Sequence, residues 1–164
     1  MKRIILHWTA GKLQPNNVDS EHYHYLVTGD SLVIEGKYTP KDNENCQDGK
    51  YAAHTGGGNT GSIGVALCGM LGYQSRYKTG SQLLKQSQCE RAFKLMAELA
   101  KEYNIQIDSD HIMTHYEFGQ KNPNTSSYGK IDITYLPPYP NVTQSGIGDF
   151  IRNKVKWYYK NMVK

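Results

Sequence analysis

Two histidines stand far apart in the sequence, and each ends a short apolar run. His7 follows the run at residues 4–6, and His115 follows the run at residues 112–114. Such runs are typical of buried strands, so both imidazoles are expected at one edge of a sheet, with the carboxylate of Asp132 brought alongside. Two imidazoles and one carboxylate suit a catalytic zinc ion, which takes three protein ligands and leaves its fourth position to water.

Other residues compete for the place of the third ligand. Asp110 is close to His115 in the sequence, and Cys68 offers a thiol. Cys68 lies in the small, apolar segment 61–69, which favours a buried packing role for its side chain. The three cysteines are odd in number and have no CxxC spacing, so neither a complete disulfide framework nor a cysteine zinc knuckle is expected, and a reducing compartment is the simplest environment.

The hydrophobic pattern predicts helices interspersed with strands. This pattern indicates an α/β fold with a central mixed β-sheet flanked by helices. The length of 164 residues fits one domain spanning 1–164. We expect strands at 2–7, 22–27, 32–35, 61–69 and about 111–115, helices from Asp19 or Ser20, from about 81 to 103 and from about 147 to 162, and a long polar loop over 118–129.

Composition excludes an integral membrane protein. Apolar residues make up 38% and charged residues 21% of the chain, and no apolar stretch approaches the ~20 residues that cross a bilayer. The basic start is followed by only three apolar residues, against ~7–15 in a secretory signal, which predicts synthesis in the cytoplasm without a cleaved signal peptide.

The net charge of +4 includes a cluster of basic residues near the C-terminus. A basic patch attracts anionic polymers such as nucleic acid or cell wall, and a solvated helix face is the equally good alternative. The apolar residues Ile147, Ile151 and Val155 within the same segment favour packing of this helix against the protein. The basic residues are Arg152, Lys154, Lys156, Lys160 and Lys164.

Several further motifs accompany the two histidines in a fixed order. They are His7-Trp8-Thr9-Ala10-Gly11, Tyr23-His24-Tyr25-Leu26-Val27, Ala53-His54-Thr55-Gly56 leading to Asn59, Ser62-Ile63-Gly64-Val65, His115-Tyr116-Glu117 and Lys130-Ile131-Asp132. Together they resemble the zinc-dependent N-acetylmuramoyl-L-alanine amidases of the type 2 class, which share a fold with the peptidoglycan recognition proteins and include small phage endolysins. The resemblance extends from residue 3 to about residue 140.

The resemblance implies a role for each matching residue. It makes His7, His115 and Asp132 the zinc ligands, and Tyr23 and Lys130 the catalytic side chains. It also implies that His54 and Asn59 bind substrate.

Three further expectations concern the surroundings of these residues. Glu117 could hold the second ring nitrogen of a zinc-bound histidine. The interval between His115 and Lys130 is longer than in compact members of the family, so residues 118–129 are expected to form a loop over the cleft. Some members carry a glutamate where this chain has Ala66, which favours a mechanism based on tyrosine and lysine. We expect His22, His24 and His111 to be structural or surface residues.

The resulting functional hypothesis is a peptidoglycan amidase. The enzyme would cleave the amide between N-acetylmuramic acid and L-alanine and would act as a monomeric phage endolysin, made in the host cytoplasm and reaching the wall after membrane disruption. The principal alternative is a peptidoglycan recognition module without turnover, although such relatives typically lack a zinc ligand. A third alternative, a protein or nucleic-acid partner, rests on the basic C-terminal helix alone, and no nucleic acid is expected.

Overall fold

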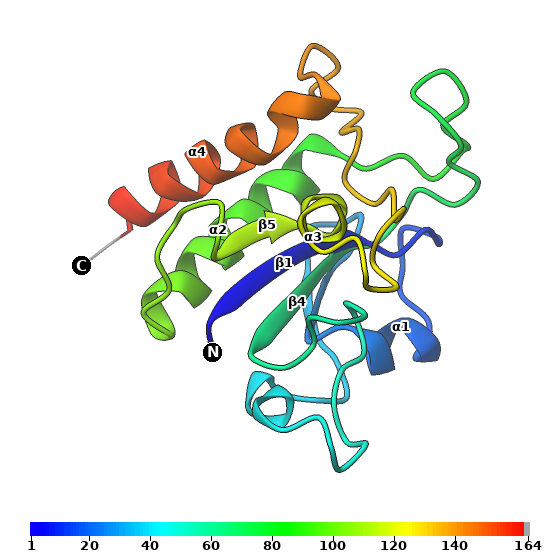
Figure 1. Ribbon diagram of the computed structural model, residues 1–164. Helices are drawn as coiled ribbons and strands as arrows, with labels where there is room; N and C mark the ends of the chain where they lie inside the picture. The colour runs from blue at the N-terminus through cyan, green and yellow to red at the C-terminus, as the bar shows by residue number, and fades with distance from the viewer. Residues whose placement is uncertain (163–164) are drawn as a thin grey trace.

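A five-stranded sheet forms the centre of the protein (Figure 1). The computed structural model describes residues 1–162, so Lys164 of the basic cluster lies outside the described residues. The strands lie in the order β3-β2-β4-β1-β5; β1 pairs in parallel with β4 and β5, β2 in parallel with β4, and β3 antiparallel with β2. Their bounds are Arg3–Trp8 (β1), Tyr25–Val27 (β2), Val33–Glu35 (β3), Ser62–Leu67 (β4) and Ile112–Thr114 (β5).

Helices lie on both faces of this sheet, which confirms the predicted fold class. The long helices α2 and α4 pack against each other on one face, and α3 contacts β1 and β5 on the opposite face (Figure 1). The α-helices are α1 (Asn17–His22), α2 (Gln86–Glu102), α3 (His115–Lys121) and α4 (Ile147–Lys160), with 3₁₀ turns at Pro40–Glu44 and Gln144–Gly146. Within the described residues, no helix has the length and hydrophobicity needed to cross a bilayer.

The two faces of the central strand β4 differ in side-chain size. Ile63, Val65 and Leu67 belong to the main hydrophobic core with α2 and α4. The alternate positions point to the other face and carry only small residues at 62, 64 and 66. His7 of β1 is level with Ala66 in this pairing, so its imidazole enters a face that β4 leaves uncrowded.

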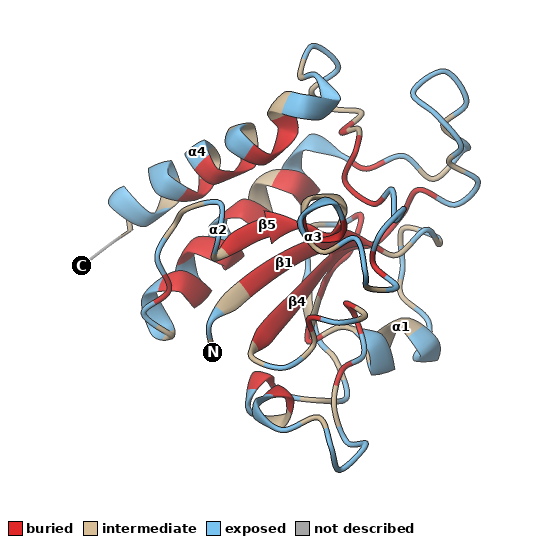
Figure 2. Cartoon of the chain, in the orientation of Figure 1, coloured by how far each residue is buried: buried red, intermediate tan, exposed pale blue. Residues whose placement is uncertain are grey.

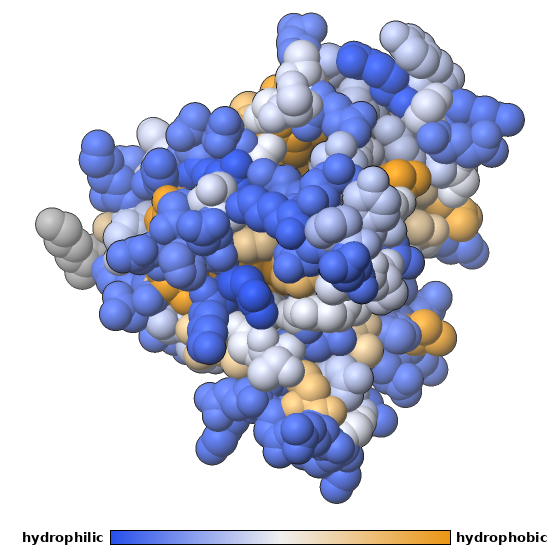
Figure 3. Space-filling view, in the orientation of Figure 1, coloured by the Kyte–Doolittle hydropathy of each residue, from blue (hydrophilic) through white to orange (hydrophobic). Residues whose placement is uncertain are grey.

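Burial follows the same division. Strands β4 and β5 are buried throughout, β1 and β2 are buried after their first residues, and the facing sides of α2 and α4 are buried as well (Figure 2). The outer surface in the view of Figure 3 is mostly hydrophilic, with small, separate hydrophobic areas.

Two predicted elements begin later than the sequence pattern indicated. The strand expected over 22–27 starts only at Tyr25, because Asn16 caps a short helix that extends to His22; its side chain accepts from the backbone amide of Asp19. The helix expected from about 81 starts at Gln86, where the side chain of Gln88 accepts from the amide of Lys85. Polar side chains therefore cap the first turn of both helices, and the strand follows where α1 ends at His22.

The predicted polar loop over 118–129 is wrong in its first part. Residues 115–121 form α3, which begins with a capping box between Thr114 and Glu117. Two turns of helix are too short for a periodic apolar stripe to mark them in the sequence. The capping residues were the available signal.

The basic C-terminal helix is packed against the protein. Ile147, Ile151 and Val155 are at most 2% exposed and join the main core. Arg152 is also buried, and its guanidinium donates to both carboxylate oxygens of Glu117 at 3.0 Å. The helix is therefore part of the core, as its apolar residues predicted, and Arg152 is not available to an external polymer.

Candidate metal centre and active-site hollow

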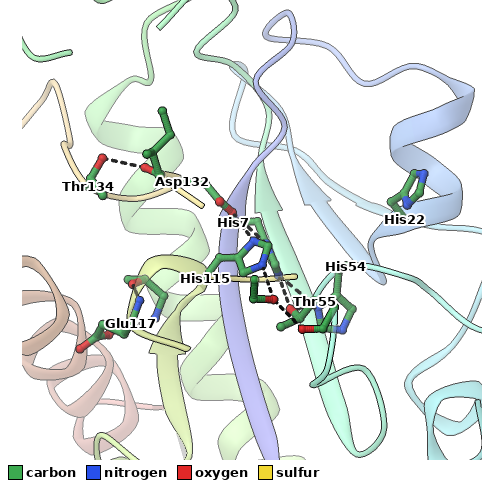
Figure 4. A network of polar contacts seen from close by, with 12 residues as sticks. His7, His22, His54, Thr55, His115, Glu117, Asp132 and Thr134 are labelled. Atoms are coloured by element: carbon green, nitrogen blue, oxygen red, sulfur yellow. Dashed lines mark hydrogen bonds and ion pairs between the residues drawn. The ribbon is translucent and has the colours of Figure 1, made fainter. Parts of the chain in front are cut away.

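The first three predicted site residues come from neighbouring elements. His7 is the fifth residue of β1, and His115 is the first residue of α3, directly after β5. Because β1 and β5 are adjacent and parallel, their carboxyl ends bring the two imidazoles together (Figure 4). Asp132 lies in a turn beyond α3, next to Ile133, whose buried side chain anchors the turn even though its φ of +64° is unfavourable for a β-branched residue.

The three side chains converge on one point. The Nδ1 atom of His7 lies 3.1 Å from Nδ1 of His115 and 3.0 Å from Oδ2 of Asp132. The third side of this triangle, from Nδ1 of His115 to Oδ2 of Asp132, is 3.1 Å. The residues are 0%, 6% and 8% exposed, so bulk water does not separate these atoms.

The contacts of His54 determine which nitrogen of His7 carries a proton. The Nε2 atom of His54 lies 3.2 Å from the carbonyl oxygen of Ser62, which can only accept, so this nitrogen donates. The Nδ1 atom of His54 is therefore an acceptor, and Nε2 of His7 is 3.1 Å from it. Thr55 Oγ1, at 3.3 Å, is a further acceptor for the same proton. The proton of neutral His7 is thus on Nε2, which leaves a lone pair on Nδ1.

Ser127 fixes the proton of His115 in the same way. Its hydroxyl donates to the carbonyl oxygen of Gly56 at 2.7 Å, so its oxygen accepts from Nε2 of His115 at 3.0 Å. The Nδ1 atom of His115 then also carries a lone pair.

This arrangement places three acceptors at about 3 Å from one another. Burial lowers the pKa of His7 to about 4, which keeps its ring neutral at pH 7. Burial alone would raise the pKa of Asp132, but the two adjacent imidazoles outweigh it and hold this pKa well below its usual value. Neutral imidazoles and an ionised carboxylate are the forms that bind a metal, so the residues fit a divalent cation.

The two other candidates for the third metal ligand lie away from His7 and His115. Asp110 is exposed and pairs with Lys121, and Cys68 is buried in the cluster with Leu26 and Ala66. Asp132 is therefore the carboxylate that the fold brings to the two histidines.

A hollow of about 550 Å³ opens above this triangle. Tyr23 and Lys130 both line it, together with Trp8, Asp19, His54 and Ile131. The ring of Tyr23 lies 5.2 Å from that of His7, centroid to centroid. Burial, followed by the charge of Asp132, raises the pKa of the Tyr23 phenol, so it remains protonated. Lys130 is exposed on the opposite segment and brings an ammonium group to the same hollow.

His54 packs closely against β4 and contacts His7. Its ring occupies the space that a side chain at residue 64 would take: a Cβ atom there would lie 2.5 Å from Cγ of His54. Gly64 is therefore needed for His54 to reach His7. Burial, followed by the charges of the neighbouring histidines, holds the pKa of His54 well below its usual value.

Two expectations about neighbouring residues change. Asn59 is not among the residues that line the hollow; its side-chain oxygen accepts from the backbone amides of His54 and Thr55, so it fixes their loop. Glu117 does not hold a ring nitrogen of either histidine, because both its oxygens are taken by Arg152. The partners of the histidine Nε2 atoms are His54, Thr55 and Ser127 instead.

The other histidines have structural contacts. His24 is buried between the side chain of Asn43 and the amide of Gly64, His22 contacts the carbonyl oxygen of Ala53, and His111 pairs with Asp108. Sequence reasoning missed Ser127, which lies in a polar segment where nothing distinguishes it from its neighbours.

Comparison with known proteins identifies a family. Residues 1–130 match the family described as N-acetylmuramoyl-L-alanine amidase, a range that ends two residues before Asp132. A search of the curated proteins found no match.

Two structures of PlyL share the fold. A mutant of PlyL is 24% identical with a TM-score of 0.54, covering 94% of this chain and 84% of that one. Another structure of PlyL is 21% identical with a TM-score of 0.52, covering 94% and 82%. The Drosophila peptidoglycan recognition protein SD is 18% identical with a TM-score of 0.48, covering 70% and 69%. With four-fifths of its length matched, the chain belongs to the N-acetylmuramoyl-L-alanine amidase family.

Proposed function

We propose that this protein is a zinc-dependent amidase that hydrolyses the bond between N-acetylmuramic acid and L-alanine in peptidoglycan, with residues 1–164 forming one catalytic domain. The observation that carries the proposal is the triangle of acceptor atoms on His7, His115 and Asp132 at the floor of the hollow. A bound zinc ion supplies an acidic water with a pKa of about 7 and polarises a carbonyl group. Mass spectrometry of digested peptidoglycan tests this function, because the amidase leaves stem peptides with a free L-alanine amine.

The side chains around the hollow then have distinct tasks. The Lys130 ammonium stabilises negative charge on the carbonyl oxygen of the scissile amide. The protonated phenol of Tyr23 donates a hydrogen bond to the substrate or to water. Nδ1 of His54 accepts a hydrogen bond from Nε2 of His7, which keeps Nδ1 of His7 directed at the metal.

The role of His54 predicts a change in metal affinity. In His54→Ala the Nε2 proton of His7 loses its aligned partner, so we expect zinc affinity to fall by about 10- to 100-fold. Competition with a chromophoric chelator measures this without any substrate. His22→Ala is the matched control, because His22 also lines the hollow but contacts none of the three ligands, and its zinc affinity should equal that of the wild type. Unchanged affinity in His54→Ala would remove this role.

The recognition module without turnover remains the second candidate. Both functions need the hollow, but only hydrolysis needs the metal and Lys130. The complete set of three ligands supports the enzyme, and the absence of new amine ends after prolonged digestion would favour recognition.

We further propose that the protein is a monomeric phage endolysin that acts on the wall after the membrane is breached. The support is the family, whose small members include phage endolysins. Bacteria that express the chain in the cytoplasm should stay intact and should lyse only when the membrane is permeabilised. Lysis without permeabilisation would contradict this order of events.

A further inference from the structure

A second cavity adjoins the active-site hollow. It has a volume of about 290 Å³ and lies between residues 73–77 and the segment that follows Asp132. Ile131 lines both spaces. Tyr73, on the wall of the second cavity, also packs against Trp8 of the hollow, with 4.8 Å between ring centroids. The two spaces are therefore neighbours, with Ile131 on the wall of both.

Arg76 is held in place at this cavity. Its guanidinium carbon lies 5.9 Å from the ring centroid of Tyr77 and 5.3 Å from that of Tyr135. One of its terminal nitrogens donates to the carbonyl oxygen of Pro140 at 2.9 Å. These contacts with two aromatic rings and a carbonyl oxygen restrict the guanidinium, so less side-chain entropy is lost when its remaining N–H groups bind an anion.

The charge of the lining selects the type of ligand. Arg76 is the one charged side chain among the residues that line this cavity, and the others are neutral. Tyrosine, glutamine and threonine offer apolar surface and neutral hydrogen bonds to the rest of a ligand. The lining thus suits a chain that is largely neutral and carries a carboxylate.

We propose that this cavity is a subsite for a carboxylate of the peptidoglycan stem peptide, with Arg76 as the group that binds it. The inference rests on the proposed function. In the intact substrate the carboxyl group of muramic acid is consumed in the amide, so the N-acetylated sugars are uncharged. The free carboxylates belong to the peptide. A fixed guanidinium next to the hollow therefore favours the peptide side of the scissile bond over the glycan side.

Calorimetric titration with a soluble stem peptide tests the subsite without requiring turnover. The probes are a tripeptide that begins L-alanyl-γ-D-glutamyl, with free carboxylates, and the same tripeptide with its carboxylates converted to amides. In Arg76→Ala we expect the affinity for the free tripeptide to fall about tenfold or more, because a charge-assisted pair is lost. The amidated tripeptide should bind the wild type and the variant equally weakly.

Lys78→Ala is the matched control. Lys78 lies on the same short hairpin and is exposed, but it does not line the cavity. Its loss removes the same charge, so it should change the affinity by less than about twofold if the effect is local. Equal losses in both variants would show general electrostatic attraction and overturn the subsite.

Other outcomes also decide the matter. The proposal is overturned if Arg76→Ala binds the free tripeptide as tightly as the wild type does. It is also overturned if the substitution weakens binding of a peptide-free disaccharide instead. Arg76 is exposed, and thermal melting shows whether the variant is folded. A wild type that binds the tripeptide but never releases stem peptides would refute the amidase while leaving the subsite in place.

Discussion

Lys130→Ala should lose most of its hydrolytic rate while keeping its metal. The side chain lines the hollow but is exposed, so its removal leaves no buried cavity. Removing one well-placed donor to a developing oxyanion typically lowers the rate by about 10²- to 10³-fold, and we expect a fall of that size. Release of stem peptides from purified peptidoglycan measures the rate, and elemental analysis of the same sample measures zinc.

The control for this variant is Lys121→Ala. Lys121 is an exposed lysine at the end of α3 that pairs with Asp110, outside the hollow. It should hydrolyse peptidoglycan at the wild-type rate. If Lys130→Ala kept more than about a tenth of that rate, the role of the ammonium in catalysis would be lost, since even a single neutral donor contributes more.

His7→Ala should lose both the metal and the activity. The substitution removes one corner of the triangle and leaves Asp132 and His115 as a pair, and two ligands do not hold zinc as three do. We expect a zinc content near zero after dialysis and no measurable release of stem peptides. Both readouts are needed, because loss of activity with retained zinc would point to a different metal site.

His111→Ala serves as the matched control for this substitution. His111 is a histidine near β5 that pairs with Asp108 and lies away from the hollow. It should keep one zinc ion per chain and full activity. Zinc retention by His7→Ala at the control level would exclude His7 as a ligand.

The sequence predicted the sheet because its strands are buried and apolar. Segment 61–69 was expected to form a buried strand, and β4 is the middle strand of the sheet with every residue buried. The strands expected at 22–27 and 32–35 correspond to β2 and β3, which pair antiparallel. The short helices α1 and α3 were harder, since both depend on capping by Asn16 and Thr114 rather than on a repeated apolar stripe.

For the site, the sequence predicted the first set of side chains better than their support. His7 and His115 stand at the ends of recognisable apolar runs, and the parallel pairing of β1 with β5 brings them together. The partners of their second nitrogens depend on loop paths that no local pattern records. Glu117 was the expected partner of a histidine ring nitrogen because it is near His115 in the sequence. The packing of α4 instead places Arg152 against its carboxylate.

Diffraction data collected at the zinc absorption edge test the central claim most directly. We predict one anomalous peak at about 2.0–2.2 Å from Nδ1 of His7, Nδ1 of His115 and a carboxylate oxygen of Asp132. The Nε2 atoms should remain hydrogen-bonded to the partners seen here. A zinc-loaded crystal without a peak between these three residues, or with the metal bound through Nε2, would contradict the account.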